Sequence, residues 1–499
     1  MRSALAGRRA WLVGGAVRDR VLGRRTQDHD VVLDGDPREA ARTLARGVSG
    51  AAAFALSEEY GGWRVVARDG AWQIDFERLR GGSLEEDLAL RDFTVNAIAE
   101  PLGAPGAAHS ETIDPLGGLG DLAQRRLREA GPRAFAEDPL RVLRLVRLAV
   151  ELELEPDPPT RAHARAYAEG LRGVATERVF MELCRIVDDP RVVHGLELME
   201  EVGATQIVLP ELHATRGVEQ NRYHHRDVYG HTLEVLERVI ALQADPVAIL
   251  SEWGEGLALA ALLAEPLADG LTRGGALRWG ALLRDAAKPL TREVRPEDGR
   301  VTFVGQDLRG AELAGEVLRR LRSSGRLQVH VAALVRDHLR LGFLAHEPQP
   351  LARRTVFAYL RACEPVEVDV TLLSIADRLA GRNGDAGRFG DASEASVSRI
   401  GRRRVSPGFG RGDRAQESID AHLRLARAML GDALRWRAAG GAPQPLWRGD
   451  ELAHELGIPL GPRLGELLEE LAAARYAGKI VTRAQALEHA REVLAFSGS

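Results

Sequence analysis

The sequence predicts a multidomain protein in which an α+β region comes first and an all-α remainder follows. The chain has 499 residues, of which 45% are hydrophobic, and this is enough for several globular domains. Up to about residue 115, short apolar runs typical of strands alternate with helix-like segments. Beyond about residue 120 the apolar residues recur with helical periodicity, and the abundance of Ala, Leu and Arg also favours helix.

In the N-terminal region, strands are predicted at "AWLV" (10–13), "DHDVVL" (28–33), "WRVVAR" (63–68) and "WQIDFERL" (72–79). Helices are predicted at "AVRDRVLG" (16–23) and "REAARTLARGV" (38–48). Asp69-Gly70 joins the last two strands and is typical of a hairpin turn. Further along the chain, breaks at 155–160 and 208–225 suggest boundaries, and the polar, Gly- and Arg-rich segment 381–414 is predicted to be a mobile loop or linker.

Composition excludes several classes of protein. The net charge of −4 argues against a uniformly basic nucleic-acid coat, although it leaves a local basic patch possible. Cys184 and Cys363 cannot form a disulfide framework, and no Cys-x-x-Cys metal spacing exists. No apolar run is long enough to span a bilayer, and the N-terminus lacks the apolar stretch of a secretory signal. A cytoplasmic location without membrane association is therefore expected.

The stretch "TQDHDVVLDG" (26–35) places Asp28 and Asp30 at the start of an apolar strand. Residues i and i+2 of a strand point to the same face, so the two carboxylates lie side by side. Carboxylates at this spacing repel each other unless a cation lies between them, and a pair of this kind can hold two metal ions. The alternative is an Asp-rich turn before a strand.

Other residues near this pair favour phosphate chemistry. Gly14-Gly15 follows a predicted strand and opens a helix, where free backbone N–H groups can bind phosphate, and Arg18 lies one turn further on. For the glycine pair alone, a simple tight turn is the alternative. Asp75, on a later strand, can supply a third carboxylate. Together these features indicate nucleotidyl transfer, in which one ion activates a hydroxyl and another holds pyrophosphate.

Five segments occur in one order within the first 150 residues. They are "GGAVRD" (14–19), "DHD" (28–30), "RDFTVNAIA" (91–99), "DPLGGLGDL" (114–122) and "EDPLRVLRLVRLA" (137–149). This series resembles the motifs of bacterial class II tRNA nucleotidyltransferases and their poly(A) polymerase relatives. The segments 175–187 and 446–490 are also similar to that family. The resemblance covers the first half of the chain most closely.

The resemblance implies a polymerase-beta-like nucleotidyltransferase head (1–125), a helical neck (126–205), a degenerate HD-type body (206–380) and a helical tail (381–499). It also implies that Asp28 and Asp30 bind Mg²⁺ and that Asp75 assists deprotonation of the tRNA 3′-hydroxyl. Gly14, Gly15 and Arg18 would hold the triphosphate. Arg91, Asp92 and Asn96 would contact ribose and triphosphate.

The helix after Glu137 carries an unusual row of arginines. Arg141, Arg144 and Arg147 recur every third residue between apolar rows, so they should be partly enclosed and need acceptors. Structural salt bridges are one explanation. The resemblance suggests another, in which the row belongs to a nucleotide site. Asp138 and Arg141 then act as a protein template for the edge of the incoming base, because Arg donates and Asp accepts.

The chain departs from the family in two places. Only "ERLRGGSLEEDLAL" (77–90) separates the Asp75 strand from the "RDFT" motif, and Leu90 replaces the first Arg of that motif. CCA-adding relatives usually carry a longer, flexible loop in this segment, so its shortness resembles the CC-adding branch.

The second departure is in the body. His231, Asp285 and Asp377 match an HD-type metal phosphohydrolase, but Arg284 and Gln306 stand where histidines are expected. Arginine cannot ligate a metal, so phosphohydrolase activity is not expected. A second set of histidines shows no ligand spacing and is expected at the surface or in helix packing; it comprises His224, His225, His330, His338 and His346. The arginines of 399–414 either contact tRNA phosphates or form a solvated loop.

The sequence therefore predicts a tRNA nucleotidyltransferase that uses Mg²⁺ and adds C residues from CTP. Complete CCA addition or A addition, which also require ATP, and poly(A) synthesis are alternatives with the same chemistry. An HD phosphohydrolase and an inactive RNA-binding protein are alternatives of other classes. The sequence does not predict whether the protein is a monomer or a homodimer.

Overall fold

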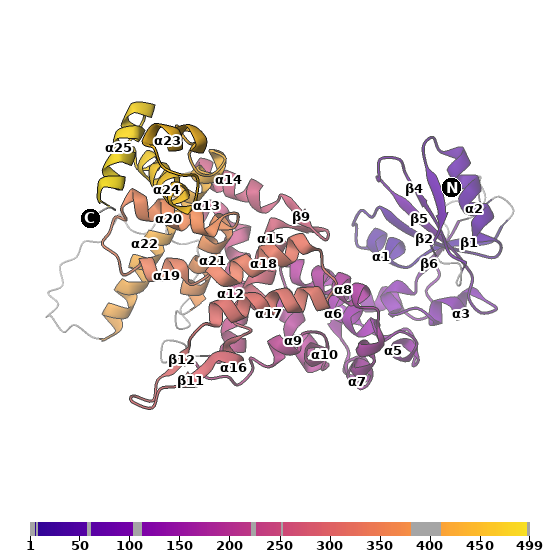
Figure 1. Ribbon diagram of the computed structural model, residues 1–499. Coiled ribbons are helices and arrows are strands. Elements are labelled where there is room, and N and C mark those ends of the chain that lie inside the picture. Colours follow the sequence, from indigo (N-terminus) through magenta and orange to yellow (C-terminus); the bar gives the residue numbers. More distant parts are fainter. Residues whose placement is uncertain are drawn as a thin grey trace, which may run out of the picture. The chain divides into compact units, whose positions relative to one another are not determined.

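The computed structural model describes residue 5 and residues 8–56, 61–102, 112–220, 226–250, 253–380 and 411–496 (Figure 1). The chain forms two compact units, Met1–Val208 and Leu209–Ser499. Their division lies near the predicted end of the neck at residue 205. The predicted boundaries at residues 125 and 380 stay predictions, and most of the predicted linker, 381–410, lies outside the described residues.

The first unit is built on a six-stranded mixed sheet. Its strands are β1 (Ala10–Val13), β2 (Asp28–Leu33), β3 (Ala52–Ala55), β4 (Trp63–Val66), β5 (Gln73–Arg78) and β6 (Ala99–Pro101). They lie in the order β3-β4-β5-β2-β1-β6. Strands β2 and β5 are parallel, and the other neighbours are antiparallel. The four predicted strands are confirmed, whereas β3 and β6 were not predicted.

Short helices surround the sheet and a helical group follows it. They are α1 (Gly15–Val21), α2 (Pro37–Gly47), α3 (Leu84–Ala89), the 3-10 turn η2 (Thr94–Asn96), α4 (Gly118–Ala123), α5 (Ala134–Glu137), α6 (Arg141–Leu152), α7 (Pro158–Tyr167), the 3-10 helix η3 (Ala168–Gly173), α8 (Thr176–Asp188), α9 (Val192–Glu201) and α10 (Thr205–Val208). Strands β7 (Arg126–Leu127) and β8 (Glu155–Pro156) form a small parallel pair. The predicted break at 155–160 is the start of α7, where Asp157 caps the helix through the N–H of Thr160.

Two packing contacts position the candidate site. Leu84 and Leu88 of α3 are buried in one cluster with Val13 and Val32 of the sheet, so α3 is anchored beside β1 and β2. Helix α6 packs on α8 and α9, and apolar residues on both sides of its arginine row, including Leu143, are fully buried. The arginine row is therefore enclosed, as its sequence pattern indicated.

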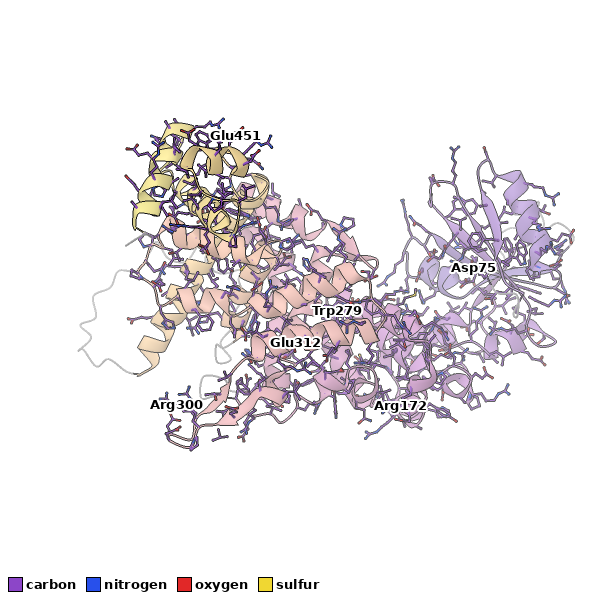
Figure 2. The ribbon with its side chains drawn as sticks, in the orientation of Figure 1. Asp75, Arg172, Trp279, Arg300, Glu312 and Glu451 are labelled. Carbon is purple, nitrogen blue, oxygen red and sulfur yellow. The ribbon has the colours of Figure 1, made fainter. Side chains whose placement is uncertain are left out.

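The second unit is helical apart from two small strand pairs. Its elements are α11 (Pro210–His213), α12 (Val228–Ala244), α13 (Pro246–Ile249), α14 (Trp253–Leu263), β9 (Pro266–Ala268), β10 (Leu271–Thr272), α15 (Arg273–Leu283), α16 (Lys288–Thr291), β11 (Arg292–Val294), β12 (Val301–Phe303), α17 (Gln306–Arg320), α18 (Gly325–Asp337), α19 (Arg340–Leu344), α20 (Arg353–Cys363), α21 (Glu367–Ala380), α22 (Arg411–Ala438), α23 (Gly449–Leu456), α24 (Pro462–Tyr476) and α25 (Arg483–Phe496). Trp279 of α15 is fully buried in its core (Figure 2). Among the described helices, none has both the length and the apolar character to cross a bilayer.

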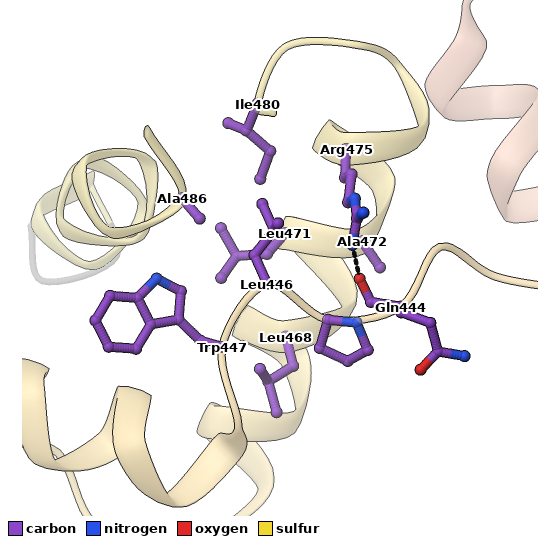
Figure 3. Close-up of a pocket in the computed structure, with 10 residues that line it drawn as sticks. Gln444, Leu446, Trp447, Leu468, Leu471, Ala472, Arg475, Ile480 and Ala486 are labelled. Carbon is purple, nitrogen blue, oxygen red and sulfur yellow. Dashed lines mark hydrogen bonds between the residues drawn. The ribbon is translucent and has the colours of Figure 1, made fainter. Parts of the chain in front are cut away.

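The C-terminal helices close around a small hollow. Trp447, Leu468, Leu471 and Ile480 line it (Figure 3), and its volume is about 10 Å³. A space of this size holds about one water molecule. It therefore reflects packing of α24 and α25 against the segment that precedes α23, and it offers no room for a ligand.

Candidate active site

Four carboxylates share one face of the sheet in the first unit. Asp28 and Asp30 lie on β2, and Asp30 is paired in register with Asp75 of the parallel strand β5. Paired residues of neighbouring strands point to the same face, so Glu77, two residues after Asp75, lies there as well. Asp28 and Asp30 are exposed, whereas the apolar end of β2 is buried. The strand thus presents its acidic end to solvent and its apolar end to the core.

The surroundings of Asp30 disfavour its charged form. Asp30 keeps exposed surface at the cavity, but the protein around its carboxylate displaces much of its hydration, and this raises the pKa of Asp30 to about 6. The negative charges of Glu77 and Asp75 add to this effect, while Arg91 and Arg144 oppose it. A bound cation would relieve the same repulsion. Within the described part of the chain, no three His, Cys, Asp or Glu side chains form a group that could hold a metal. An ion at Asp28 and Asp30 would therefore need further oxygen ligands from substrate and water, which is usual for Mg²⁺.

Asp75 is already paired in the structure. Arg64 of β4 donates from Nε to Asp75 Oδ1 and from Nη2 to Oδ2, at 2.7 Å each. The two residues are directly opposite in the β4–β5 hairpin. Acceptance of a proton by Asp75 would therefore require this bidentate pair to open.

Gly14 lies where the chain passes closest to the acidic cluster. Its φ is +73°, and a Cβ there would lie 3.1 Å from Nη1 of Arg91 and 3.2 Å from Oδ2 of Asp30. The backbone conformation therefore favours glycine, and a Cβ would crowd the ends of both side chains. Arg18 of α1 bends back over Gly15, and its Nη1 donates to Oδ1 of Asn96 at 2.6 Å.

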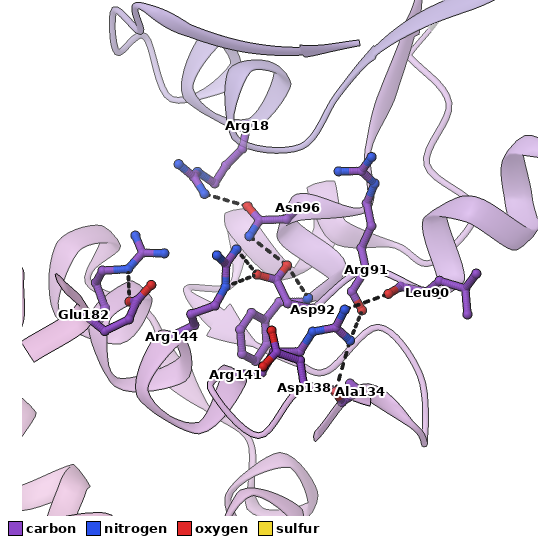
Figure 4. Close-up of polar contacts among 12 residues, drawn as sticks. Arg18, Leu90, Arg91, Asp92, Asn96, Ala134, Asp138, Arg141, Arg144 and Glu182 are labelled. Atoms are coloured by element: carbon purple, nitrogen blue, oxygen red, sulfur yellow. Dashed lines mark hydrogen bonds and ion pairs between the residues drawn. The ribbon is translucent and has the colours of Figure 1, made fainter. Parts of the chain in front are cut away.

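A continuous polar network starts from Arg18 (Figure 4). Asn96 donates to Asp92 Oδ1 at 3.0 Å, and Arg144 donates from Nε to Asp92 Oδ2 at 2.9 Å. Burial alone would raise the pKa of Asp92, but the charge of Arg144 and the hydrogen bonds from Asn96 and Arg144 hold it below its ordinary value. Asp92 is thus a fixed anion that joins η2 to α6.

These groups surround a cavity of about 300 Å³. Its lining consists of Gly14, Gly15, Asp30, Glu77, Arg80, Arg91, Asp92, Asn96, Asp138, Arg141 and Arg144. Nine of these eleven residues were predicted from the sequence, whereas Glu77 and Arg80 were not. Asp28, Asp75, Arg18 and Arg147 do not contribute to the lining. The structure therefore brings most of the predicted site residues around one cavity.

Asp138 and Arg141 both face this cavity but are engaged separately. Arg141 donates to the carbonyl oxygens of Leu90 at 3.0 Å and of Ala134 at 3.1 Å (Figure 4). Asp138 Oδ2 accepts from Arg178 at 2.7 Å. Arg141 therefore fixes the backbone just before the "RDFT" motif while lying in the cavity wall.

Arg147 has the partners of a structural residue. Its Nε donates to Glu182 at 2.6 Å and its Nη1 donates to Glu151 at 2.8 Å, and the side chain is buried. This arrangement corresponds to the salt-bridge alternative for the arginine row. Of the three arginines in the row, Arg141 and Arg144 reach the cavity.

In the second unit, the residues matched to an HD-type site gather around an arginine. Nη2 of the buried Arg284 lies 2.9 Å from Asp285 and 3.0 Å from Asp377, and His231 Nε2 lies 3.1 Å from the same Asp377 oxygen. Burial opposes the charged form of Asp285, but Arg284 and Lys288 hold its pKa below its ordinary value. A guanidinium thus lies among three groups that are potential metal ligands.

The remaining histidines divide between core and surface. His330 and His338 are buried on α18 and at its end, and burial lowers the pKa of both. His346 is exposed. These positions agree with packing and surface roles, and His224 and His225 lie outside the described residues.

Two family models match the chain. Residues 10–128 match "Poly A polymerase head domain", and residues 153–215 match "Probable RNA and SrmB- binding site of polymerase A". The first match covers the sheet and the carboxylate cluster. The second covers the helices that directly follow α6, from α7 to α11.

Curated relatives and solved structures agree with these matches. The A-adding tRNA nucleotidyltransferase of Deinococcus radiodurans is 35% identical, with 96% of this chain and 94% of the relative aligned. The CC-adding tRNA nucleotidyltransferase of Thermus thermophilus is 33% identical over 96% of this chain and 92% of the relative. The Thermotoga maritima CCA-adding enzyme complexed with tRNA has a TM-score of 0.61 at 17% identity, over 99% of this chain and 94% of that one, and so shows the shared fold. The chain therefore belongs to the bacterial class II tRNA nucleotidyltransferases, the family that its ordered motifs indicated.

Proposed function

We propose that this enzyme adds C residues to the 3′ end of tRNA from CTP, without a nucleic-acid template, and releases pyrophosphate. One observation carries the proposal. Asp30 of the acidic cluster and the Asp138–Arg141 pair line the same cavity in the first unit. A nucleotide bound there can have its phosphates near the carboxylates while its base faces side chains that both donate and accept hydrogen bonds.

The cavity residues divide by chemistry. Gly14, Gly15 and Arg91 are the candidates in the lining for binding the triphosphate through backbone N–H groups and a guanidinium. Arg18, the fourth candidate, lies outside the lining and donates to Asn96. Asp92 and Asn96, together with Arg91, are the candidates for contacting the ribose and the triphosphate. Asp138 and Arg141 are the candidates for the base edge, and Arg144 holds Asp92 in place.

Asp28 and Asp30 are the residues that would hold Mg²⁺. When bound, Mg²⁺ supplies Lewis-acid stabilisation of the charge that develops on the phosphates and on the attacking oxygen. Asp75 is the candidate acceptor for the proton of the 3′-hydroxyl. Because both of its oxygens accept from Arg64, we propose that substrate binding loosens this pair.

The structure of residues 79–90 supports CC addition over complete CCA addition. Instead of a long loop, this segment contains α3, which Ser83 caps and whose Leu84 and Leu88 are buried in the core. A packed helix cannot rearrange as a flexible loop can. We therefore propose that the site does not switch from CTP to ATP.

Addition of a single A is the second candidate. Its support is the 35% identity to the A-adding enzyme of Deinococcus radiodurans, which extends over 96% of this chain. The same short segment is compatible with this activity, because neither reaction requires a change of nucleotide.

The test uses two tRNA transcripts, one that lacks the 3′-terminal CCA and one that ends in CC. Each is incubated with Mg²⁺ and CTP, ATP or both, and products are resolved at single-nucleotide length. CC addition yields two added C residues on the first transcript and nothing on the second, even with ATP present. A completed CCA end contradicts the specificity proposal. Extension of only the CC-ended transcript, and only by A, favours the second candidate. Asp30→Asn serves as the inactive control.

A further inference from the structure

We propose that Asp87 is a positioning residue that holds Arg80 and Arg91 as a pair of phosphate-binding guanidiniums at the cavity, and that Arg80 contacts a substrate phosphate. The inference rests on the proposed function and adds two residues to it, Asp87 and Arg80. Neither of these belongs to the motifs that carry the family resemblance. Both lie in the short segment between β5 and the "RDFT" motif.

Asp87 is the anchor of this arrangement. Its side chain is completely buried on α3, and its Oδ1 accepts from the backbone N–H of Arg80 at 3.0 Å and from Arg80 Nε at 3.1 Å. Its Oδ2 accepts from Arg91 Nη2 at 3.3 Å. One buried carboxylate therefore orients two arginines that lie on either side of it in the sequence.

Both arginines reach the cavity. Arg80 and Arg91 belong to its lining, and the Arg80 side chain remains 43% exposed. Nη1 of Arg91 lies beside Gly14, next to Asp30. Arg91 thus lies at the acidic cluster, and Arg80 lines the same cavity as Asp30 and Glu77, where a bound phosphate group would bring negative charge.

A second buried aspartate in the first unit also binds two arginines, but those arginines do not reach the cavity. Asp121 is also completely buried and binds two arginines, Arg126 and Arg128, whose side chains are 42% and 39% exposed. Neither of them lines the cavity. Arg126 therefore has the same kind of anchor and exposure as Arg80 without access to the site.

The ligand that suits this pair is a phosphate group. A guanidinium presents planar N–H donors that match phosphate oxygens, and a partner that holds it in advance reduces the entropy lost on binding. The phosphate can belong to the nucleotide triphosphate or to the backbone at the tRNA 3′ end. These sources share their chemistry and differ in which substrate loses affinity when the arginine is removed.

The central variant is Arg80→Gln, with Arg80→Lys as the charge-retaining variant and Arg126→Gln as the matched control. Binding of CTP with Mg²⁺ is measured by calorimetry without tRNA, and KM for CTP, KM for tRNA and kcat are measured in the extension assay. We expect Arg80→Gln to weaken the binding of one of the two substrates, CTP or tRNA, by about tenfold. Arg80→Lys should recover part of this loss, and Arg126→Gln should have the same affinity and KM values as wild type. Weaker CTP binding identifies the triphosphate, and a higher KM for tRNA alone identifies the tRNA backbone.

The positioning role is tested with Asp87→Asn and the double variant Asp87→Asn/Arg80→Gln. If Asp87 acts through Arg80, the Arg80→Gln substitution should raise the KM of the affected substrate by a smaller factor in the Asp87→Asn background than in the wild-type background. Lower thermal stability of Asp87→Asn with unchanged KM values overturns the positioning role. Arg80→Gln that behaves like Arg126→Gln towards both substrates overturns the phosphate contact. Wild-type protein that neither binds CTP nor extends tRNA would instead refute the proposed function.

Discussion

Arg144 donates from both Nε and Nη2 to a single carboxylate oxygen of Asp92, and this contact joins α6 to η2. Asp92 in turn accepts from Asn96, and Asn96 accepts from Arg18 at the start of α1. The network therefore connects three separate elements around the cavity. Because buried polar networks of this kind have few alternative arrangements, the cavity walls should be rigid before a substrate binds.

Replacing Arg144 with Met should destabilise the protein by about 2–3 kcal/mol, because it leaves the buried Asp92 without its cationic partner. Chemical unfolding followed by circular dichroism measures the loss. Arg172→Met is the control, since Arg172 and Glu169 form an exposed pair. Exposed pairs contribute at most about 1 kcal/mol. Equal effects of the two substitutions would contradict the role of the Asp92–Arg144 contact.

Stability should fall in acid because two buried carboxylates have lowered pKa values. Burial opposes this lowering at Asp92 and Asp285, and nearby cationic groups outweigh it. Groups of this kind stabilise the fold fully above their ordinary pKa of about 4 and lose that contribution as the pH falls below it. We expect the Tm to drop steeply below about pH 4 and less steeply in Asp92→Asn. Parallel Tm curves for wild type and variant would refute the contribution of Asp92.

Gly14→Ala should reduce activity through two separable effects. Gly14 has φ +73° and Gly23 has φ +69°, but of these two only Gly14 lies where a Cβ would approach side-chain atoms of the site. Gly23→Ala therefore reports the backbone strain alone, about 1 kcal/mol. We expect similar losses of stability in both variants and a loss of nucleotide addition only in Gly14→Ala. Full activity of Gly14→Ala would show that the space beside Asp30 and Arg91 is not needed.

Asp28→Asn and Asp30→Asn should each lower the rate of nucleotide addition by roughly three orders of magnitude, because each removes a charged oxygen ligand from the proposed ion. Both residues are exposed, so the fold should be retained. Single-turnover extension measures the rate, and a filter-binding assay with labelled tRNA measures binding, which should remain near wild type. Wild-type turnover in either variant would refute the metal assignment.

Arg284→Met should destabilise the second unit by about 3 kcal/mol or more, since it leaves Asp285 and Asp377 without the guanidinium that both contact. Thermal unfolding of this variant is compared with that of Arg309→Met. Arg309 forms exposed pairs with Glu312 and Glu316 and serves as the control. Indistinguishable stability of the two variants would show that Arg284 does not hold this cluster together.

Local patterns were sufficient to predict four of the strands and, in the cavity lining, Gly14, Gly15 and Asp30. The family resemblance was needed for the other predicted lining residues, namely Arg91, Asp92, Asn96, Asp138, Arg141 and Arg144. The alternation of Asp28, Asp30 and the apolar residues after them defined both the strand and its exposed end. The pairing of Arg64 with Asp75 was also within reach: a hairpin turn centred on Asp69-Gly70 places residues 64 and 75 opposite each other.

Other features depend on contacts that no local pattern encodes. Arg284 and Asp377 are 93 positions apart, and only the packing of α15 and α21 in one unit brings them together. The burial of Asp87 could not be predicted for a different reason. An acidic residue in a short helix is usually solvated, and its complete burial here follows from how α3 packs on the sheet.

The connection between β5 and α3 is short and held at both ends. The N–H of Leu79 donates to the carbonyl of Leu33, and Ser83 caps α3, so residues added before α3 would enter among residues 80–82. An insertion there separates Arg80 from Asp87. In the evolution of such enzymes, a longer and more adaptable connection would thus come at the expense of a fixed positive charge beside the substrate. In the two proposals made above, nucleotide choice and the phosphate contact of Arg80 both depend on the length of this one segment.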